Sequence, residues 1–154
     1  MLAVILAGLA LPGAAGKAQA EGLRFRVGDW ITECGAAGCS ITGLFQQTNL
    51  NGRRGAFALV ILLGNRQLAV VGSPYPDHAR LQIDANNPIA CAGSRYCIFP
   101  GSETGRAIAE LGTGSLILLD VRTHRDVFRA SLSTRGYQAS LAKLEAEGYR
   151  VPTM

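Results

Sequence analysis

The chain has 154 residues, with 15 basic and 11 acidic side chains and a formal net charge of +4. Hydrophobic residues make up 48% of it and charged residues 17%, below the roughly 25% charged residues of a typical soluble protein. These values exclude a large multidomain enzyme, a polytopic membrane protein, a collagen-like chain, a coiled coil and a disordered chain. They fit one ordinary domain with a hydrophobic core.

The N-terminal segment has the pattern of an export signal. Residues 1–16 are almost wholly apolar or small, and the small-x-small site Ala18-Gln19-Ala20 follows. This pattern predicts a signal peptide over 1–20 and a mature domain over 21–154. The alternative, a membrane anchor, needs roughly 20 apolar residues, whereas this run is shorter and carries Pro12. Because no basic residue precedes the run, we expect the true start codon to lie upstream.

The mature chain shows period-two alternation and short apolar runs, which are both typical of strands. We expect the run 57–63 to be a buried central strand, Asn51-Gly52 to form a turn, and 73–77, with its two prolines, to be a loop. Short strands with turns about every ten residues indicate an all-β domain folded as a β-sandwich. The predicted strands are 30–34, 39–47, 57–63, 67–71, 80–84, 89–91, 96–99, 116–121 and 127–133.

Two segments have the spacing of helices. The first, 103–111, is short, and the second, 135–147, carries Tyr137, Leu141 and Leu144 on one face. The predicted N-caps are Ser102 and Thr134, and the predicted stops are Gly112 and Gly148, with Pro152 beyond the second stop.

All four cysteines lie in the mature part, and an even count in an exported chain favours disulfides. Three connectivities are possible. We favour local pairing of Cys34 with Cys39 and of Cys91 with Cys97, because each pair encloses a short turn-forming segment and would pin a hairpin tip. A redox site prefers C-x-x-C at a helix N-terminus, and a four-thiolate zinc site prefers C-x2-C, so both alternatives are disfavoured.

Three segments together resemble one protein family. Residues 29–34 (DWITEC), followed by Cys39, resemble the "GDW…C…C" signature of the invasion-associated locus B family. Residues 81–84 (LQID) with the two later cysteines resemble its central part, and 131–141 resemble its closing "SL-x-GF-x-x-AL" segment. The match runs from about Gly28 to Leu144, with Tyr137 in place of the usual Phe.

The resemblance implies an immunoglobulin-like β-sandwich with a short helix and a C-terminal helix. It implies an exported protein of alphaproteobacteria that is periplasmic, associated with the outer envelope or secreted, in a family whose named member is linked to host-cell entry. The family has no established catalytic residues to carry over. Since a buried tyrosine needs a hydroxyl partner, we expect the ring edge of Tyr137 to be exposed.

The sequence carries no recognisable catalytic motif. It lacks a phosphate-binding glycine loop and a G-x-S-x-G elbow, and its two histidines, His78 and His124, fall in predicted turns or loops. Asp84 is expected to end a strand and cap a turn. We therefore expect no catalytic residue, cofactor or metal site, and keep as alternatives a thiol-redox enzyme and a hydrolase that uses His78 in a triad assembled in space.

Two basic clusters remain. One is Arg53-Arg54 on a predicted loop tip. The other lies at or beside a predicted hairpin and comprises Arg122, His124, Arg125 and Arg129. Arg53, Arg54, Arg122 and Arg125 are candidates for contacting lipopolysaccharide or anionic lipid, with solvated loops as the ordinary alternative. Nucleic acid is not expected, because aromatic residues are only 6% and the charge is modest. We predict a non-enzymatic envelope protein that binds or stabilises a protein or glycan partner, with no stable membrane span in the mature chain.

Overall fold

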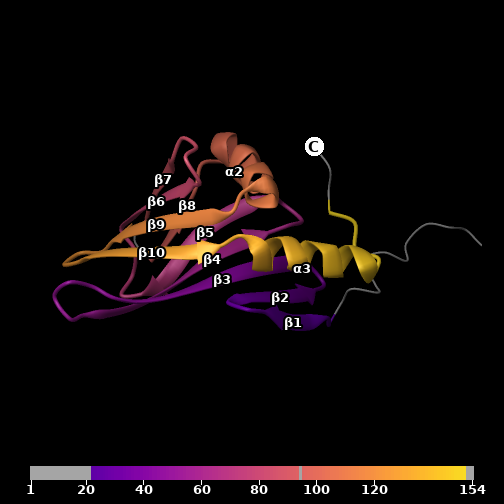
Figure 1. Cartoon of the computed structure of the whole chain (residues 1–154), viewed down its shortest axis with the longest axis horizontal. Helices are drawn as coiled ribbons and strands as arrows, with labels where there is room; N and C mark the ends of the chain where they lie inside the picture. The colour runs from indigo at the N-terminus through magenta and orange to yellow at the C-terminus, as the bar shows by residue number, and fades with distance from the viewer. Residues whose placement is uncertain (1–21, 94, 152–154) are drawn as a thin grey trace, which may run out of the picture.

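A computed structural model describes residues 22–93 and 95–151 (Figure 1), so the predicted signal peptide and Pro152 lie outside the described residues. The described helices are each too short or too polar to cross a membrane. In chain order the elements are β1 (Arg24–Val27), β2 (Trp30–Gly35), β3 (Gly38–Thr48), β4 (Arg54–Leu62), β5 (Gln67–Ser73), β6 (His78–Ile83), β7 (Ile89–Ala92), β8 (Tyr96–Ile98), α2 (Gly101–Thr113), β9 (Leu116–Arg122), β10 (Val127–Ser133) and α3 (Arg135–Ala146).

The strands form one antiparallel sheet of ten, in the order β1-β2-β3-β4-β5-β8-β7-β6-β9-β10. At the end of the sheet β10 pairs with β9. Because the sheet curls, β10 also lies against β3 (Figure 1). The predicted all-β fold with two helices is confirmed. Because the strands are hydrogen-bonded into one continuous sheet, the immunoglobulin-like sandwich stays a prediction.

Period-two alternation places one face of each long strand in the core. In β4, Phe57, Leu59 and Ile61 are buried, as the predicted strand 57–63 required. The strand is central, between β3 and β5, but it is buried on one face only, and Leu62 is 37% exposed. An unbroken apolar run therefore did not indicate a strand covered on both faces.

Strand β1 was not predicted from the sequence. Its inward positions, Phe25 and Val27, are only half-buried, and arginines occupy the alternate positions. It pairs with β2 at the edge of the sheet, where Arg24 lies 3.0 Å from Glu33. A short edge strand needs few apolar residues, so its signal in the sequence is weak.

The helix ends differ from the predictions. Helix α2 begins at Gly101, with Pro100 rather than Ser102 as its N-cap, because the Pro100 carbonyl accepts the first backbone hydrogen bonds. Gly112 lies inside this helix, which ends at Thr113. Thr134 is the N-cap of α3, but its hydroxyl donates to the Gly114 carbonyl instead of capping. The predicted stop at Gly148 is confirmed by its positive φ of 85°.

Trp30 ties the two ends of the sheet together. It is 1% exposed, and its Nε1 donates to the Ser133 carbonyl at 2.9 Å, which joins β2 to the end of β10. Tyr137 packs on it with the ring centroids 5.7 Å apart. The expected exposure of the Tyr137 ring is wrong, since the residue is 1% exposed, and burial raises the pKa of its hydroxyl to about 12.

Both predicted disulfides are present. Cys34 and Cys39 are bonded and face each other across the β2–β3 hairpin, and the Cys91–Cys97 bond ties β7 to β8. All four cysteines are buried, and none is a free thiol. The pairs therefore fasten neighbouring strands, as local pairing predicted.

Candidate functional site

Two loops that are far apart in sequence meet at one end of the curled sheet. Residues 49–53 connect β3 to β4, and residues 123–126 connect β9 to β10. Figure 1 shows both at the left, with α3 toward the right. We call these two loops, with the flanking Arg54, Arg122 and Val127, the loop end.

The first loop is a tight turn organised by Asn49. Its backbone carbonyl accepts from Gly52 N at 3.0 Å, and its side-chain Oδ1 accepts from Asn51 N and Arg53 N at 3.0 and 2.9 Å. Gly52 has a φ of 75°, which is the conformation for which Asn-Gly is selected in turns. The predicted turn is confirmed, and it holds Leu50 at a corner, fully exposed.

The second loop is closed by Thr123 and Asp126, which are both buried. Thr123 N donates to the Asp126 carbonyl at 2.8 Å, and Asp126 N donates to Thr123 Oγ1 at 3.1 Å. Residues His124 and Arg125 form the exposed tip between them. The hydrogen bonds fix the base of the hairpin and leave its cationic corner in solvent.

The Asp126 carboxylate fastens the two loops together. Its Oδ1 accepts from Asn49 Nδ2 at 3.1 Å, although the two residues are 77 positions apart. Its Oδ2 lies 3.4 Å from Arg53 Nη1, and the side chains of Asp126 and Arg53 are 5% and 56% exposed. One buried carboxylate therefore sets the relative position of the Asn49 turn and the basic hairpin.

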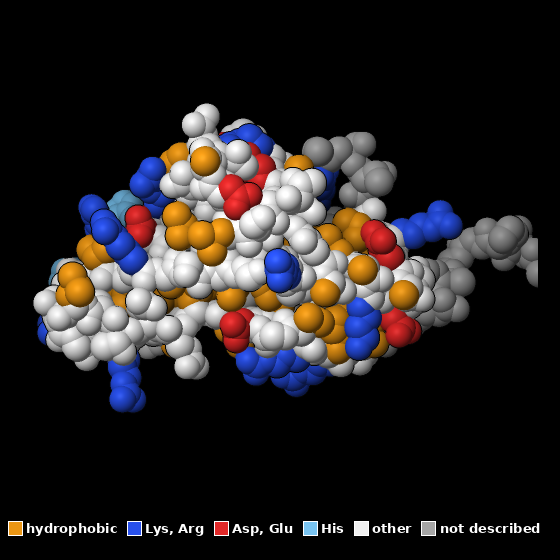
Figure 2. Space-filling view, in the orientation of Figure 1, with side chains coloured by type: hydrophobic (Ala, Val, Ile, Leu, Met, Phe, Trp, Pro, Cys, Tyr) orange, Lys and Arg blue, Asp and Glu red, His pale blue; other side chains and the backbone are white. Residues whose placement is uncertain are grey.

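The structure brings the four predicted arginines to this end. Arg53 is paired with Asp126, while Arg54, Arg122 and Arg125 are exposed, and none of these three forms an ion pair with another described residue. Blue side chains are prominent at the left of Figure 2, beside apolar surface. An open hollow of about 910 Å³ lies at the loop end. Among the described residues that line it, Asp126 is the only acidic one.

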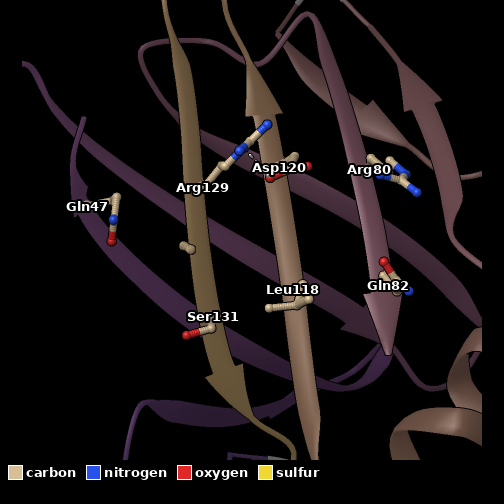
Figure 3. Close-up of a pocket in the computed structure, with 8 residues that line it drawn as sticks. Gln47, Arg80, Gln82, Leu118, Asp120, Arg129 and Ser131 are labelled. Atoms are coloured by element: carbon tan, nitrogen blue, oxygen red, sulfur yellow. Dashed lines mark ion pairs between the residues drawn. The ribbon is translucent and has the colours of Figure 1, made fainter. Parts of the chain in front are cut away.

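The outer face of β6, β9 and β10 extends this surface. Strand register aligns His78, Arg122 and Val127 in one row, and it aligns Arg80, Asp120 and Arg129 in the next. Figure 3 shows the second row, in which Arg129 Nε lies 3.4 Å from Asp120 Oδ1. A shallow hollow of about 550 Å³ lies over this face, with Gln47 from β3 at its border. Cations outnumber carboxylates here too.

The residues weighed for catalysis lie apart. His78 is exposed at the start of β6, and Asp84 follows the end of the same strand. Asp84 lies at the end of this strand as predicted, but its carboxylate does not cap a local turn. It accepts from Ser115 N and Leu116 N at distances down to 2.9 Å, and so fastens the end of β6 to the start of β9. Within the described ranges, no three His, Cys, Asp or Glu side chains converge as metal ligands.

Sequence reasoning missed two important members of the loop end. Leu50 could have been noticed as an apolar residue placed beside an Asn-Gly turn, where polar residues are usual. Nothing local marks Asp126 as buried, because its partners come from the other loop.

Comparison of the chain with protein-family models, curated proteins and solved structures gives no match. The loop end presents several cations and exposed apolar side chains on two mutually fastened loops, an arrangement suited to binding an anionic or mixed surface.

Proposed function

We propose that this chain is an exported, non-enzymatic binding protein of the cell envelope, related to the invasion-associated locus B proteins and folded as an immunoglobulin-like sandwich. The loop end contacts its partner, an envelope protein or glycan. The periplasm, the outer envelope and secretion all fit this role.

The observation that carries the proposal is the convergence of two basic loops. The buried Asp126 holds the Asn49 turn against the β9–β10 hairpin, so their arginines are presented together. Rigid elements that position several charged side chains in advance lose less entropy on binding than separate flexible loops would. Binding is therefore the activity that this geometry favours.

The cysteine pairs support the same interpretation. Both are closed and buried, and disulfides persist in oxidising compartments such as the periplasm. A catalytic cysteine pair is usually accessible to solvent and easily reduced, whereas these two cysteine pairs fasten adjacent strands in the core. This supports a structural role and an exported protein over the thiol-redox alternative.

The test is partner capture with matched charge reversals. The exported protein is crosslinked in envelope extracts at near-native expression, and its partners are identified by mass spectrometry. Arg54→Glu/Arg125→Glu alters the loop end. Arg135→Glu/Arg150→Glu makes the same charge change at two exposed positions, the first residue of α3 and a residue beyond its end. We expect the first variant to lose an enriched partner that the second retains.

Two results would contradict the proposal. Capture that is unaffected by the loop-end variant would show that the contact lies elsewhere. Turnover of a substrate that His78→Ala abolishes would instead support the hydrolytic alternative.

A second candidate function is binding to an anionic surface, lipopolysaccharide or lipid, through Arg53, Arg54, Arg122 and Arg125. The excess of cations at the loop end favours it, because Asp126 is already occupied by Asn49 and Arg53. Salt should weaken such binding, since exposed charges are screened beyond about 8 Å at physiological ionic strength.

A further inference from the structure

Leu50 is held in solvent by a well-defined turn. It is 106% exposed, the highest exposure among the large hydrophobic side chains that the structure describes. Asn49 accepts hydrogen bonds from the backbone N–H groups of Asn51, Gly52 and Arg53. These bonds fix the backbone of the turn around residue 50, so the turn itself holds this side chain in solvent. A single exposed leucine is common in proteins, but one fixed at the tip of a cationic surface needs a reason.

The charges around Leu50 suggest what covers it. Arg122 and Arg125 line the same hollow as Leu50, together with Val127, which is 47% exposed. Arg53 and Arg54 lie three and four positions after Leu50 in the sequence. An apolar tip surrounded by cations matches a surface that has anionic groups outside and an apolar layer beneath.

A bilayer fits this pattern better than the other anionic partners. A soluble phosphate or a glycan would engage the arginines and leave Leu50 in water. A protein interface of standard size buries about 800 Å² on each partner and has an apolar centre of several side chains. The loop end offers two exposed apolar side chains, Leu50 in the turn between β3 and β4 and Val127 at the start of β10.

We infer that the loop end docks on anionic phospholipid bilayers, with Leu50 inserted among the acyl chains and the arginines at the phosphates. This inference deepens the second candidate function, binding to an anionic surface, and assigns the loop end to lipid in place of the protein or glycan partner. Asp126 has a positioning role, because it fastens the Leu50 turn to the Arg125 hairpin.

The experiment is vesicle flotation with the purified exported protein. The probes are vesicles of phosphatidylcholine alone and vesicles that also contain phosphatidylglycerol. We expect binding to the anionic vesicles at low salt and its loss at high salt. Leu50→Ser should weaken the partition on the order of tenfold, because the apolar transfer free energy of the leucine is lost. Since Leu50 is fully exposed, this variant should keep the stability of the parent.

Controls make the same changes away from the loop end. Leu116→Ser alters a 42%-exposed leucine at the other end of β9, and Arg135→Glu/Arg150→Glu matches Arg54→Glu/Arg125→Glu. We expect the controls to bind like the parent. In Leu50→Trp, a blue-shifted emission that bilayer-embedded nitroxides quench would place residue 50 below the headgroups.

Several outcomes would overturn the inference. One is the absence of binding to anionic vesicles, and another is binding that Leu50→Ser leaves unchanged. Binding to lipopolysaccharide micelles alone, or competition by inorganic phosphate at constant ionic strength, would assign the arginines to those ligands. Capture of an envelope protein through the same arginines, without vesicle binding, would leave the proposed function standing and remove the bilayer as the partner.

Discussion

The link made by Asp126 yields a prediction that can be worked out from its contacts. Asp126→Ala removes a carboxylate that is 5% exposed and that accepts a hydrogen bond from Asn49 at 3.1 Å. A hydrogen bond to a buried charged group contributes about 1.5–3 kcal/mol. The pair with Arg53 adds less than about 1 kcal/mol, because the Arg53 side chain is 56% exposed and screened by water.

We therefore expect Asp126→Ala to lower the free energy of unfolding by about 2 kcal/mol. For a chain of this size that corresponds to a fall in Tm of roughly 5–10 °C. Asp126→Asn keeps an acceptor oxygen for Asn49 and should cost less than about 1 kcal/mol. Urea unfolding measures the differences, and amide hydrogen exchange at residues 49–53 should speed up in Asp126→Ala.

Asp120 supplies the matched comparison. Its ion pair with Arg129 has the same 3.4 Å separation, but its side chain is 41% exposed. Asp120→Ala should therefore cost less than about 1 kcal/mol. In a double-mutant cycle, Asn49→Ala and Asp126→Ala should couple by about 1 kcal/mol. Equal costs for Asp126→Ala and Asp120→Ala, or a coupling near zero, would refute the claim that a buried carboxylate fastens the loops.

Three further predictions concern the core. Cys34→Ala/Cys39→Ala and Cys91→Ala/Cys97→Ala should each lower stability by about 2 kcal/mol in urea unfolding, because the closed loops are short; little change would show that chain entropy overstates their role. Gly136→Ala should cost about 1–3 kcal/mol, since a Cβ there would clash with Trp30 Cδ1, whereas Gly112→Ala, with no atom within 4 Å of the added Cβ, should be neutral or stabilising. Similar unfolding midpoints for the two variants would contradict this packing. Burial raises the pKa of Tyr137 from 10.0 to about 12, so the stability contributed by the neutral phenol is fully present below pH 10 and is lost as pH rises toward 12. The free energy of unfolding measured across this range should fall more steeply with pH for the parent than for Tyr137→Phe. Identical profiles would argue against a buried phenol.

The local patterns of the sequence determined most of the secondary structure. Alternation of apolar residues and short apolar runs predicted the strands from β2 to β10, and the short segments between cysteines favoured the two disulfides that formed. Gly148 ends α3 because a residue with positive φ terminates a helix at low cost. These features depend on interactions within a few positions, which is why a single sequence indicates them.

The tertiary structure decided what lies beside what. The burial of Tyr137 depends on Trp30, which the curling of the sheet brings over the start of α3. The meeting of Asn49 with Asp126 depends on β10 lying against β3, and strand order in a sheet is not encoded by the alternation of any one strand. The arginines could be named from the sequence, but only the sheet topology placed them around Leu50, because strand pairing and curl act over the whole chain.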